Sequence, residues 1–125
     1  MNALIICSHG IACDKIKYTL DKIYKNEENY YDIADNVFEA RSKMHNHIDI
    51  VIADYNLEGC GAGSGMALLQ NLHDDVRFNI MGLKSILLYL KDDIEEIEDF
   101  QRKHGHWFRI LNKNFDIEDM KIALR

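Results

Sequence analysis

The sequence predicts an α/β domain, a doubly wound sheet of five parallel strands with helices on both faces. Short continuous apolar runs, such as the one over residues 3–7, are typical of strands buried on both faces. These runs alternate with segments whose apolar residues recur at helical spacing. The alternation occurs five times in 125 residues, and strands that alternate with helices are joined by right-handed crossovers into a parallel sheet.

The first two units each place a helix directly after a strand. A strand over 3–7 is followed by Gly10 and a helix over 11–24, and a second, more exposed strand over 30–34 is followed by Asn36, which can cap a helix. The apolar residues that define the two helices are Cys13, Ile16, Leu20 and Ile23 in the first, and Val37, Ala40 and Met44 in the second.

The third unit contains the clearest strand, residues 48–53, which is rich in β-branched side chains and ends at Asp54. A glycine-rich loop follows, with glycines at positions 59, 61, 63 and 65. We expect this loop to be flexible and to shape the rim around Asp54. Met66, Leu69 and Leu72 then predict a third helix.

The last two units complete the sheet. We expect a buried strand over 85–90, a helix that starts at Asp92 or Asp93 and ends before Gly105, a strand over 107–111 and a final helix. The apolar residues that mark the two helices are Ile94, Ile97 and Phe100, and then Ile117, Met120 and Leu124. The whole of 1–125 is therefore predicted to be a single domain, which is a common domain size.

Composition excludes several classes of function. The chain has 21 acidic and 15 basic side chains, a net charge of -6, and no basic patch of the kind that nucleic-acid binding needs. It has no run of about 18 apolar residues that would span a membrane. Its three cysteines are an odd, sparse set, which indicates reduced thiols and a cytoplasmic location.

Chemistry in such sheets gathers at the carboxyl ends of the strands, near the point where the strand order reverses. The side chains expected there are those of Cys7, Ser8 and His9, of Asp54, of Tyr89 and of Lys113.

Two segments resemble receiver domains of bacterial response regulators. Residues 47–57 read HIDIVIADYNL and are followed by Gly65-Met66-Ala67, as in the third strand and third helix of receivers. Residues 110–119 read ILNKNFDIED and are similar to the fifth-strand segment of that family. The resemblance implies a flavodoxin-like receiver fold and a role in two-component phosphorelay signalling. It places Asp54 at the phospho-acceptor position and Lys113 at the position of the lysine that pairs with the phosphoryl group.

The same resemblance implies a defective metal site. Receivers hold Mg²⁺ through two acidic residues at the end of the first strand, where this chain has Cys7-Ser8 or, one residue further, Ser8-His9. Since Mg²⁺ is bound through carboxylates and phosphate oxygens, we expect Mg²⁺ binding to be weak or absent, with no other cofactor and no metal site. Tyr89 replaces the small hydroxyl residue of the fourth strand, and Asn114 replaces the proline after the lysine.

The preferred interpretation is a non-enzymatic, atypical receiver, or pseudo-receiver, that signals by binding a protein, such as a histidine kinase or an output domain. Trp107 and Ile110 are candidates for the partner face, and a homodimer is left open. We expect Phe108 to pack in the core.

Two alternatives keep a covalent phosphate. The first is a response regulator phosphorylated at Asp54. The second is a phosphohistidine carrier, because Leu4 to Gly10 also resembles mannose-type phosphotransferase IIA domains and would place the phosphate on His9. A phosphatase that uses a Cys7 thiolate is disfavoured, since position 13 holds a cysteine where the arginine of low-molecular-weight tyrosine phosphatases would stand.

Overall fold

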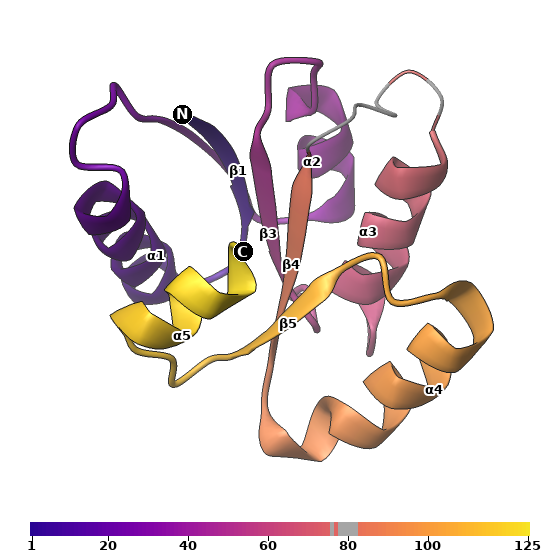
Figure 1. The fold of residues 1–125 in the computed structure, drawn as a ribbon. Coiled ribbons are helices and arrows are strands. Elements are labelled where there is room, and N and C mark those ends of the chain that lie inside the picture. The colour runs from indigo at the N-terminus through magenta and orange to yellow at the C-terminus, as the bar shows by residue number, and fades with distance from the viewer. Residues whose placement is uncertain (76, 78–82) are drawn as a thin grey trace.

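The computed structural model describes residues 1–75, 77 and 83–125, and in this part of the chain strands and helices alternate as the sequence predicts (Figure 1). The strands are β1 (Asn2–Ile6), β2 (Tyr30–Ala34), β3 (Ile50–Asp54), β4 (Lys84–Tyr89) and β5 (Arg109–Asn112). The helices are α1 (Gly10–Ile23), α2 (Val37–Lys43), α3 (Ser64–Asp74), α4 (Ile94–His104) and α5 (Ile117–Ala123), and a 3₁₀ turn (Lys91–Asp93) leads into α4.

The five strands form one parallel sheet in the order β2-β1-β3-β4-β5. The order reverses between β1 and β3, so these two neighbouring strands lie at the topological switch point. The predicted doubly wound, five-stranded parallel sheet with helices on both faces is confirmed.

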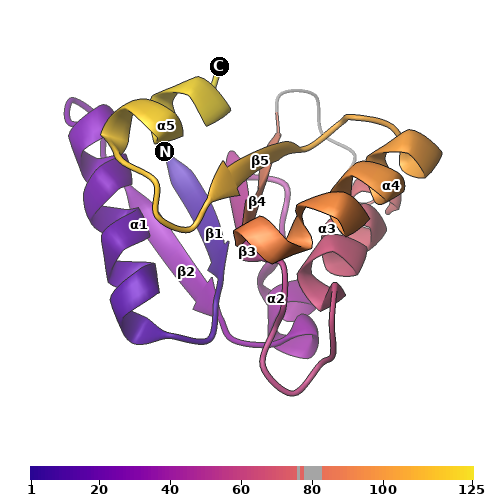
Figure 2. The same ribbon diagram turned by 90° about the horizontal axis from the view of Figure 1, so that it is seen from below.

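The two faces of the sheet carry two separate hydrophobic clusters. Along β1, Leu4 and Ile6 belong to the cluster under α2, α3 and α4, whereas Ala3 and Ile5 belong to the cluster under α1 and α5. This is the alternation that a strand imposes on successive side chains. Figure 2 shows α1 and α5 together on one side of the sheet and α2, α3 and α4 on the other. Burial on both faces explains the continuous apolar runs.

Most element boundaries fall within two residues of their predicted positions. Asn36 caps α2 as expected, because its side chain accepts a hydrogen bond from the Glu39 N–H. The last strand begins two residues later than predicted, at Arg109, and this leaves Trp107 in the preceding loop. Phe108 is 1% exposed, which confirms its predicted place in the core. No helix in the described ranges is long and apolar enough to cross a membrane.

The start of α3 is packed against the end of β3, which carries Asp54. Gly65, in the first turn of α3, donates its backbone N–H to the Tyr55 carbonyl oxygen at 2.9 Å. A Cβ atom at this position would overlap the Asp54 carbonyl oxygen. Glycine is therefore required at this helix start by close backbone approach. Gly10, at the start of α1, has no atom near the place of a Cβ.

These two glycines give a matched test of the packing. We predict that Gly65→Ala lowers the free energy of unfolding by roughly 2–3 kcal/mol, because the methyl group forces backbone apart. Gly10→Ala should be neutral or stabilising by about 0.5 kcal/mol, as expected for alanine in a helix. Urea unfolding of both variants measures the difference. Equal effects would contradict the close approach of α3 and β3.

Candidate functional site

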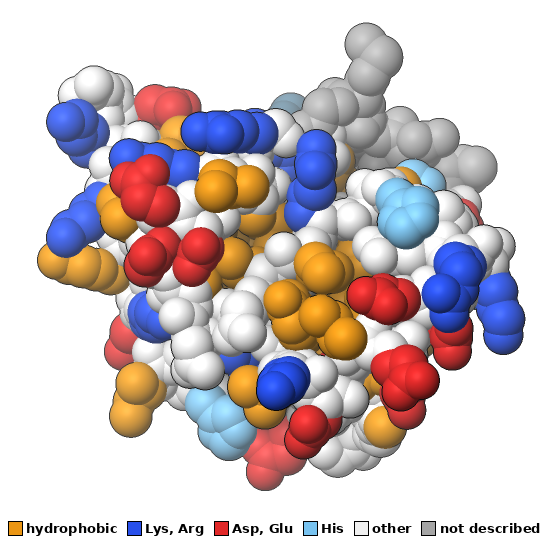
Figure 3. All heavy atoms as spheres, turned by 60° about the horizontal axis from the view of Figure 1, so that its bottom comes forward, with side chains coloured by type: hydrophobic (Ala, Val, Ile, Leu, Met, Phe, Trp, Pro, Cys, Tyr) orange, Lys and Arg blue, Asp and Glu red, His pale blue; other side chains and the backbone are white. Residues whose placement is uncertain are grey.

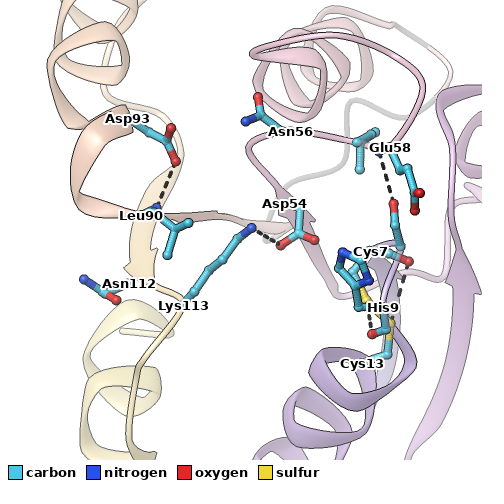
Figure 4. A network of polar contacts seen from close by, with 12 residues as sticks. Cys7, His9, Cys13, Asp54, Asn56, Glu58, Leu90, Asp93, Asn112 and Lys113 are labelled. Carbon is cyan, nitrogen blue, oxygen red and sulfur yellow. Dashed lines mark hydrogen bonds and ion pairs between the residues drawn. A yellow bond between two sulfur atoms is a disulfide. The ribbon is translucent and has the colours of Figure 1, made fainter.

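Asp54 and Lys113 meet at the carboxyl end of the sheet. Asp54 is the last residue of the central strand β3 and is 4% exposed. Lys113 follows β5, and its Nζ lies 3.7 Å from Asp54 Oδ1. In Figure 4 the Lys113 side chain reaches Asp54 from one side, and His9 lies on the other. The two residues that the resemblance singled out for phosphoryl chemistry are thus brought together.

Burial dominates the electrostatics of Asp54. It raises the pKa of the carboxyl group above its ordinary value, while the charge of Lys113, its hydrogen bond and, to a smaller extent, the charge of His9 lower it. The net direction is upward. The single lysine therefore does not fully compensate for removing the carboxylate from water.

Lys113 is positioned by the backbone around it. Its N–H donates to the Tyr89 carbonyl oxygen at 2.9 Å, which continues the β4–β5 ladder, and its carbonyl oxygen accepts from Lys15 Nζ at 3.3 Å. The Asn112 side chain accepts the Asn114 N–H at 2.9 Å.

Tyr89 is half-buried and packs against the cluster under α2, α3 and α4. Tyr89 thus fills space at the end of β4.

Cys7 is not a free thiol in the structure. It lies just after β1, 2% exposed, and forms a disulfide with Cys13 in the first turns of α1. The expectation of reduced thiols is therefore wrong for this pair, whereas Cys60 is free and exposed. Sequence spacing alone could not reveal the bond. It depends on α1 turning back over the end of β1, which brings the two Cα atoms to 6.3 Å, a usual disulfide separation.

Ser8 ties three strand ends together. Its Oγ accepts the Glu58 N–H at 3.2 Å and donates to the Asp35 carbonyl oxygen at 3.4 Å. The hydroxyl thus holds the loop after β3 against the ends of β1 and β2. His9 is exposed at the start of α1.

The glycine-rich loop after Asp54 is closed by its own hydrogen bonds. Asn56 Oδ1 accepts the Gly63 N–H, and Ser64 Oγ accepts the Leu57 N–H, both at 2.8 Å. Gly59 and Gly63 have φ values of 76° and 72°, a conformation that glycine adopts without strain. The loop therefore forms a defined rim beside the Asp54 site, in the place that the sequence predicts.

A contact that sequence reasoning missed joins α4 to the end of β3. The Tyr55 hydroxyl donates a hydrogen bond to Glu96, and the Tyr55 ring is 3% exposed. Burial, followed by the bond to Glu96, raises the pKa of Tyr55 to about 12, so the phenol keeps its proton at neutral pH. The sequence shows Glu96 only as part of an acidic helix face, and its partner depends on the tertiary fold.

The two candidates for a partner face differ in their surroundings. The Trp107 indole N–H donates to Gln70 Oε1 at 3.0 Å, and its ring stacks on His73 with centroids 4.0 Å apart. Trp107 therefore packs against α3. Ile110 lies on β5, an edge strand of the sheet, and lines a surface groove of about 340 Å³ with Tyr89 and Ile122.

The residues at the site do not fit Mg²⁺. At the end of β1, Cys7 is in a disulfide, and Ser8 offers one hydroxyl that already makes two hydrogen bonds. Asp35 and Glu58 line a shallow hollow with Ser8, of about 200 Å³. Still, no three His, Cys, Asp or Glu side chains in the described ranges are grouped so that they could hold an ion. Mg²⁺ needs carboxylates and water in near-octahedral geometry.

The fold is shared with solved receiver structures. A response regulator receiver domain protein from Clostridium thermocellum is 22% identical, with a TM-score of 0.73 over 98% of this chain and 90% of that one. The receiver domain of an HD domain-containing protein from Pseudomonas fluorescens is 21% identical, with a TM-score of 0.68 over 99% and 90%. This chain has the receiver-domain fold. The receiver domain of a histidine kinase from Syntrophus aciditrophicus is 16% identical, with a TM-score of 0.70 over 98% and 86%.

The receiver fold confirms the arrangement that the two sequence segments predict. No protein-family model and no curated protein matches the sequence. Asp54 and Lys113 lie where the resemblance places them, at the ends of β3 and β5. Their roles, and those of Cys7, Ser8, His9, Tyr89 and Ile110, stay predictions.

The raised pKa of Asp54 gives a test of its burial. A carboxyl group with a raised pKa in the folded state stabilises the fold below its unfolded-state pKa, and this contribution is lost as the pH rises through the folded-state value. At pH 7 the buried carboxylate is therefore a cost. We predict that Asp54→Asn raises the free energy of unfolding at pH 7 by about 1 kcal/mol, and that the gain shrinks toward pH 4.

Urea unfolding of the parent protein and of Asp54→Asn between pH 4 and pH 8 measures this difference. The titration of the other carboxyl groups contributes equally to both proteins and cancels in the comparison. A variant that is less stable than the parent protein at pH 7 would show that Lys113 overcompensates for burial.

Proposed function

We propose that this chain is an atypical receiver domain of two-component signalling, which acts by binding a protein partner while Mg²⁺-dependent phosphorylation of Asp54 is impaired or absent. The proposal treats the domain as a cytoplasmic, non-enzymatic module. Its partner would be a protein such as a histidine kinase or an output domain.

The state of the β1 end carries this proposal. Transfer of a phosphoryl group to a carboxylate depends on electrostatic neutralisation of the developing charge, which a metal ion normally supplies. At the end of β1 the chain offers a disulfide sulfur and a serine that is already hydrogen-bonded. Removal of one such stabilising group typically costs about 10²–10³ in rate. Without a metal ion, the positive charge near the Asp54 carboxylate comes from Lys113, 3.7 Å away, and to a smaller extent from His9.

The edge of the sheet supports a binding role. β5 has a neighbouring strand on one side, β4, and the groove beside it is lined by Tyr89, Ile110 and Ile122, the last of which is 57% exposed. Figure 3 brings the lower end of Figure 1 forward and shows hydrophobic side chains in the middle of this face, with charged side chains around them. An apolar centre with a charged rim is the usual composition of a protein interface. Ile110 is the better anchor candidate, since Trp107 is engaged with α3.

The retained Asp54–Lys113 pair favours one alternative, a receiver that is still phosphorylated at Asp54. A nucleophilic carboxylate and a nearby cation are both present. The second alternative, a phosphohistidine carrier, rests on the exposed position of His9 beside Asp54. Both make a covalent product, which separates them from the pseudo-receiver.

Phosphorylation can be measured directly by intact mass after incubation with acetyl phosphate and Mg²⁺. The pseudo-receiver predicts no mass gain in the parent protein. A Mg²⁺-dependent gain that is lost in Asp54→Asn would establish the first alternative. An acid-labile, base-stable phosphate that is lost in His9→Ala and kept in Asp54→Asn would establish the second.

A gain-of-function variant makes a negative result informative. Ser8 belongs to the metal-binding pair in either alignment of the β1 end, so Ser8→Asp restores one carboxylate to that pair. We predict that Ser8→Asp increases the rate of Mg²⁺-dependent phosphorylation by about 10²-fold or more over the parent protein. Ser42→Asp, on the exposed surface of α2, is a matched control for the added charge. An equal effect of the two substitutions would argue against a missing metal ligand.

A further inference from the structure

We propose that Cys7 and Cys13 form a reversible thiol–disulfide site, oxidised by a small peroxide, whose redox state sets the position of the loop that carries Ser8 and His9 beside Asp54. The site lies at the β1 end, where the receiver resemblance expects metal ligands. Its readouts below do not depend on whether Asp54 is phosphorylated.

The backbone around the pair suits both redox states. The Cα atoms are 6.3 Å apart, within the usual range for a disulfide. Each sulfur also has a carbonyl oxygen 3.7 Å away that its thiol could use as an acceptor. Cys13 Sγ lies at this distance from the Cys7 oxygen, and Cys7 Sγ from the His9 oxygen. The reduced thiols would therefore have partners in the same loop, so that neither state leaves a buried donor unpaired.

Reduction must nevertheless move atoms. Bonded sulfur atoms are about 2.05 Å apart, whereas non-bonded heavy atoms keep roughly 3.5–4.0 Å. The two sulfurs must therefore separate by about 1.5 Å. Both cysteines are almost fully buried, at 2% and 3% exposed, in the cluster under α1 and α5. A close-packed core does not absorb such a change without displacement of a neighbouring segment.

The segment between the two cysteines is the one that faces Asp54. It contains Ser8, which holds the loop after β3, and His9, whose charge acts on the Asp54 carboxylate. Figure 4 shows the disulfide directly below His9, with Asp54 on the other side of the ring. Displacement of this segment therefore changes the surroundings of Asp54.

The chemistry balances with a peroxide as oxidant. The thiolate of one cysteine attacks a peroxide oxygen, the O–O bond breaks, and a sulfenic acid and hydroxide form. The second thiol attacks that sulfur and releases water, so the two thiols lose two electrons and two protons and the peroxide becomes two waters. Burial of both sulfurs favours a small oxidant over a bulky disulfide. In a reducing compartment such a bond is usually transient and redox-sensing.

The test uses Cys60→Ser, which removes the exposed free cysteine and leaves Cys7 and Cys13 as the remaining thiols. The reduced protein is treated with hydrogen peroxide, unfolded, alkylated and weighed. We expect no alkylation after peroxide and two alkyl groups after a dithiol reductant. Amide NMR spectra of the two folded states should differ at Ser8, His9, Asp54 and Glu58, and dithiol should restore the reduced spectrum. Cys13→Ser in the same background should lose the reversible spectral change.

Two results would overturn the proposal. The first is a pair of thiols that remain fully alkylated after peroxide treatment of the folded protein. The second is a disulfide that forms but changes amide shifts at Cys7, Cys13 and their direct sequence neighbours alone, with Asp54 and Glu58 unaffected. Neither result depends on phosphorylation, so both are distinct from failure of the proposed function.

Discussion

Burial of the Asp54 carboxylate at the carboxyl end of the central strand is the constraint on which the site depends. The strand lies between β1 and β4 with helices on both faces, so its last side chain is removed from water wherever the loops close over it. A carboxylate in that position needs positive charge nearby. The chain provides Lys113 at 3.7 Å and the weaker effect of the His9 charge, and the pKa of Asp54 still rises. The side chains around Asp54 therefore offset only part of the cost of burying its charge.

The same constraint organises the surrounding loops. Gly65 lets α3 begin directly against the backbone of Asp54, Ser8 fastens the loop after β3 to the first two strands, and Tyr55 joins the end of β3 to Glu96 of α4. A change at any of these contacts acts on the carboxylate through the backbone. The Cys7–Cys13 bond belongs to this set, because it fixes the segment that holds Ser8 and His9.

The fold was predictable because it depends on local signals. Apolar runs buried on both faces and helical spacing of apolar residues fix the order of the elements, and Asp54 and Lys113 follow strands whose carboxyl ends must meet. Other contacts join residues far apart in the sequence and leave no local pattern. The bond between Tyr55 and Glu96, the packing of Trp107 on His73, and the hydrogen bonds of Ser8 are of this kind. The disulfide was missed for a different reason. The odd cysteine count favoured free thiols, whereas Cys7 follows a strand end and Cys13, six residues later, lies in the helix that comes next.

The central claim is that the charges at this site are arranged for an acid–lysine pair without a divalent ion. Titration of the protein with Mg²⁺, followed by amide NMR shifts at Ser8, Asp54 and Lys113, tests it most directly, with Asp54→Asn as the control. The account predicts weak, linear shifts that do not saturate at millimolar Mg²⁺ and that are the same in the variant. Saturable shifts centred on Asp54, lost in Asp54→Asn, would contradict it.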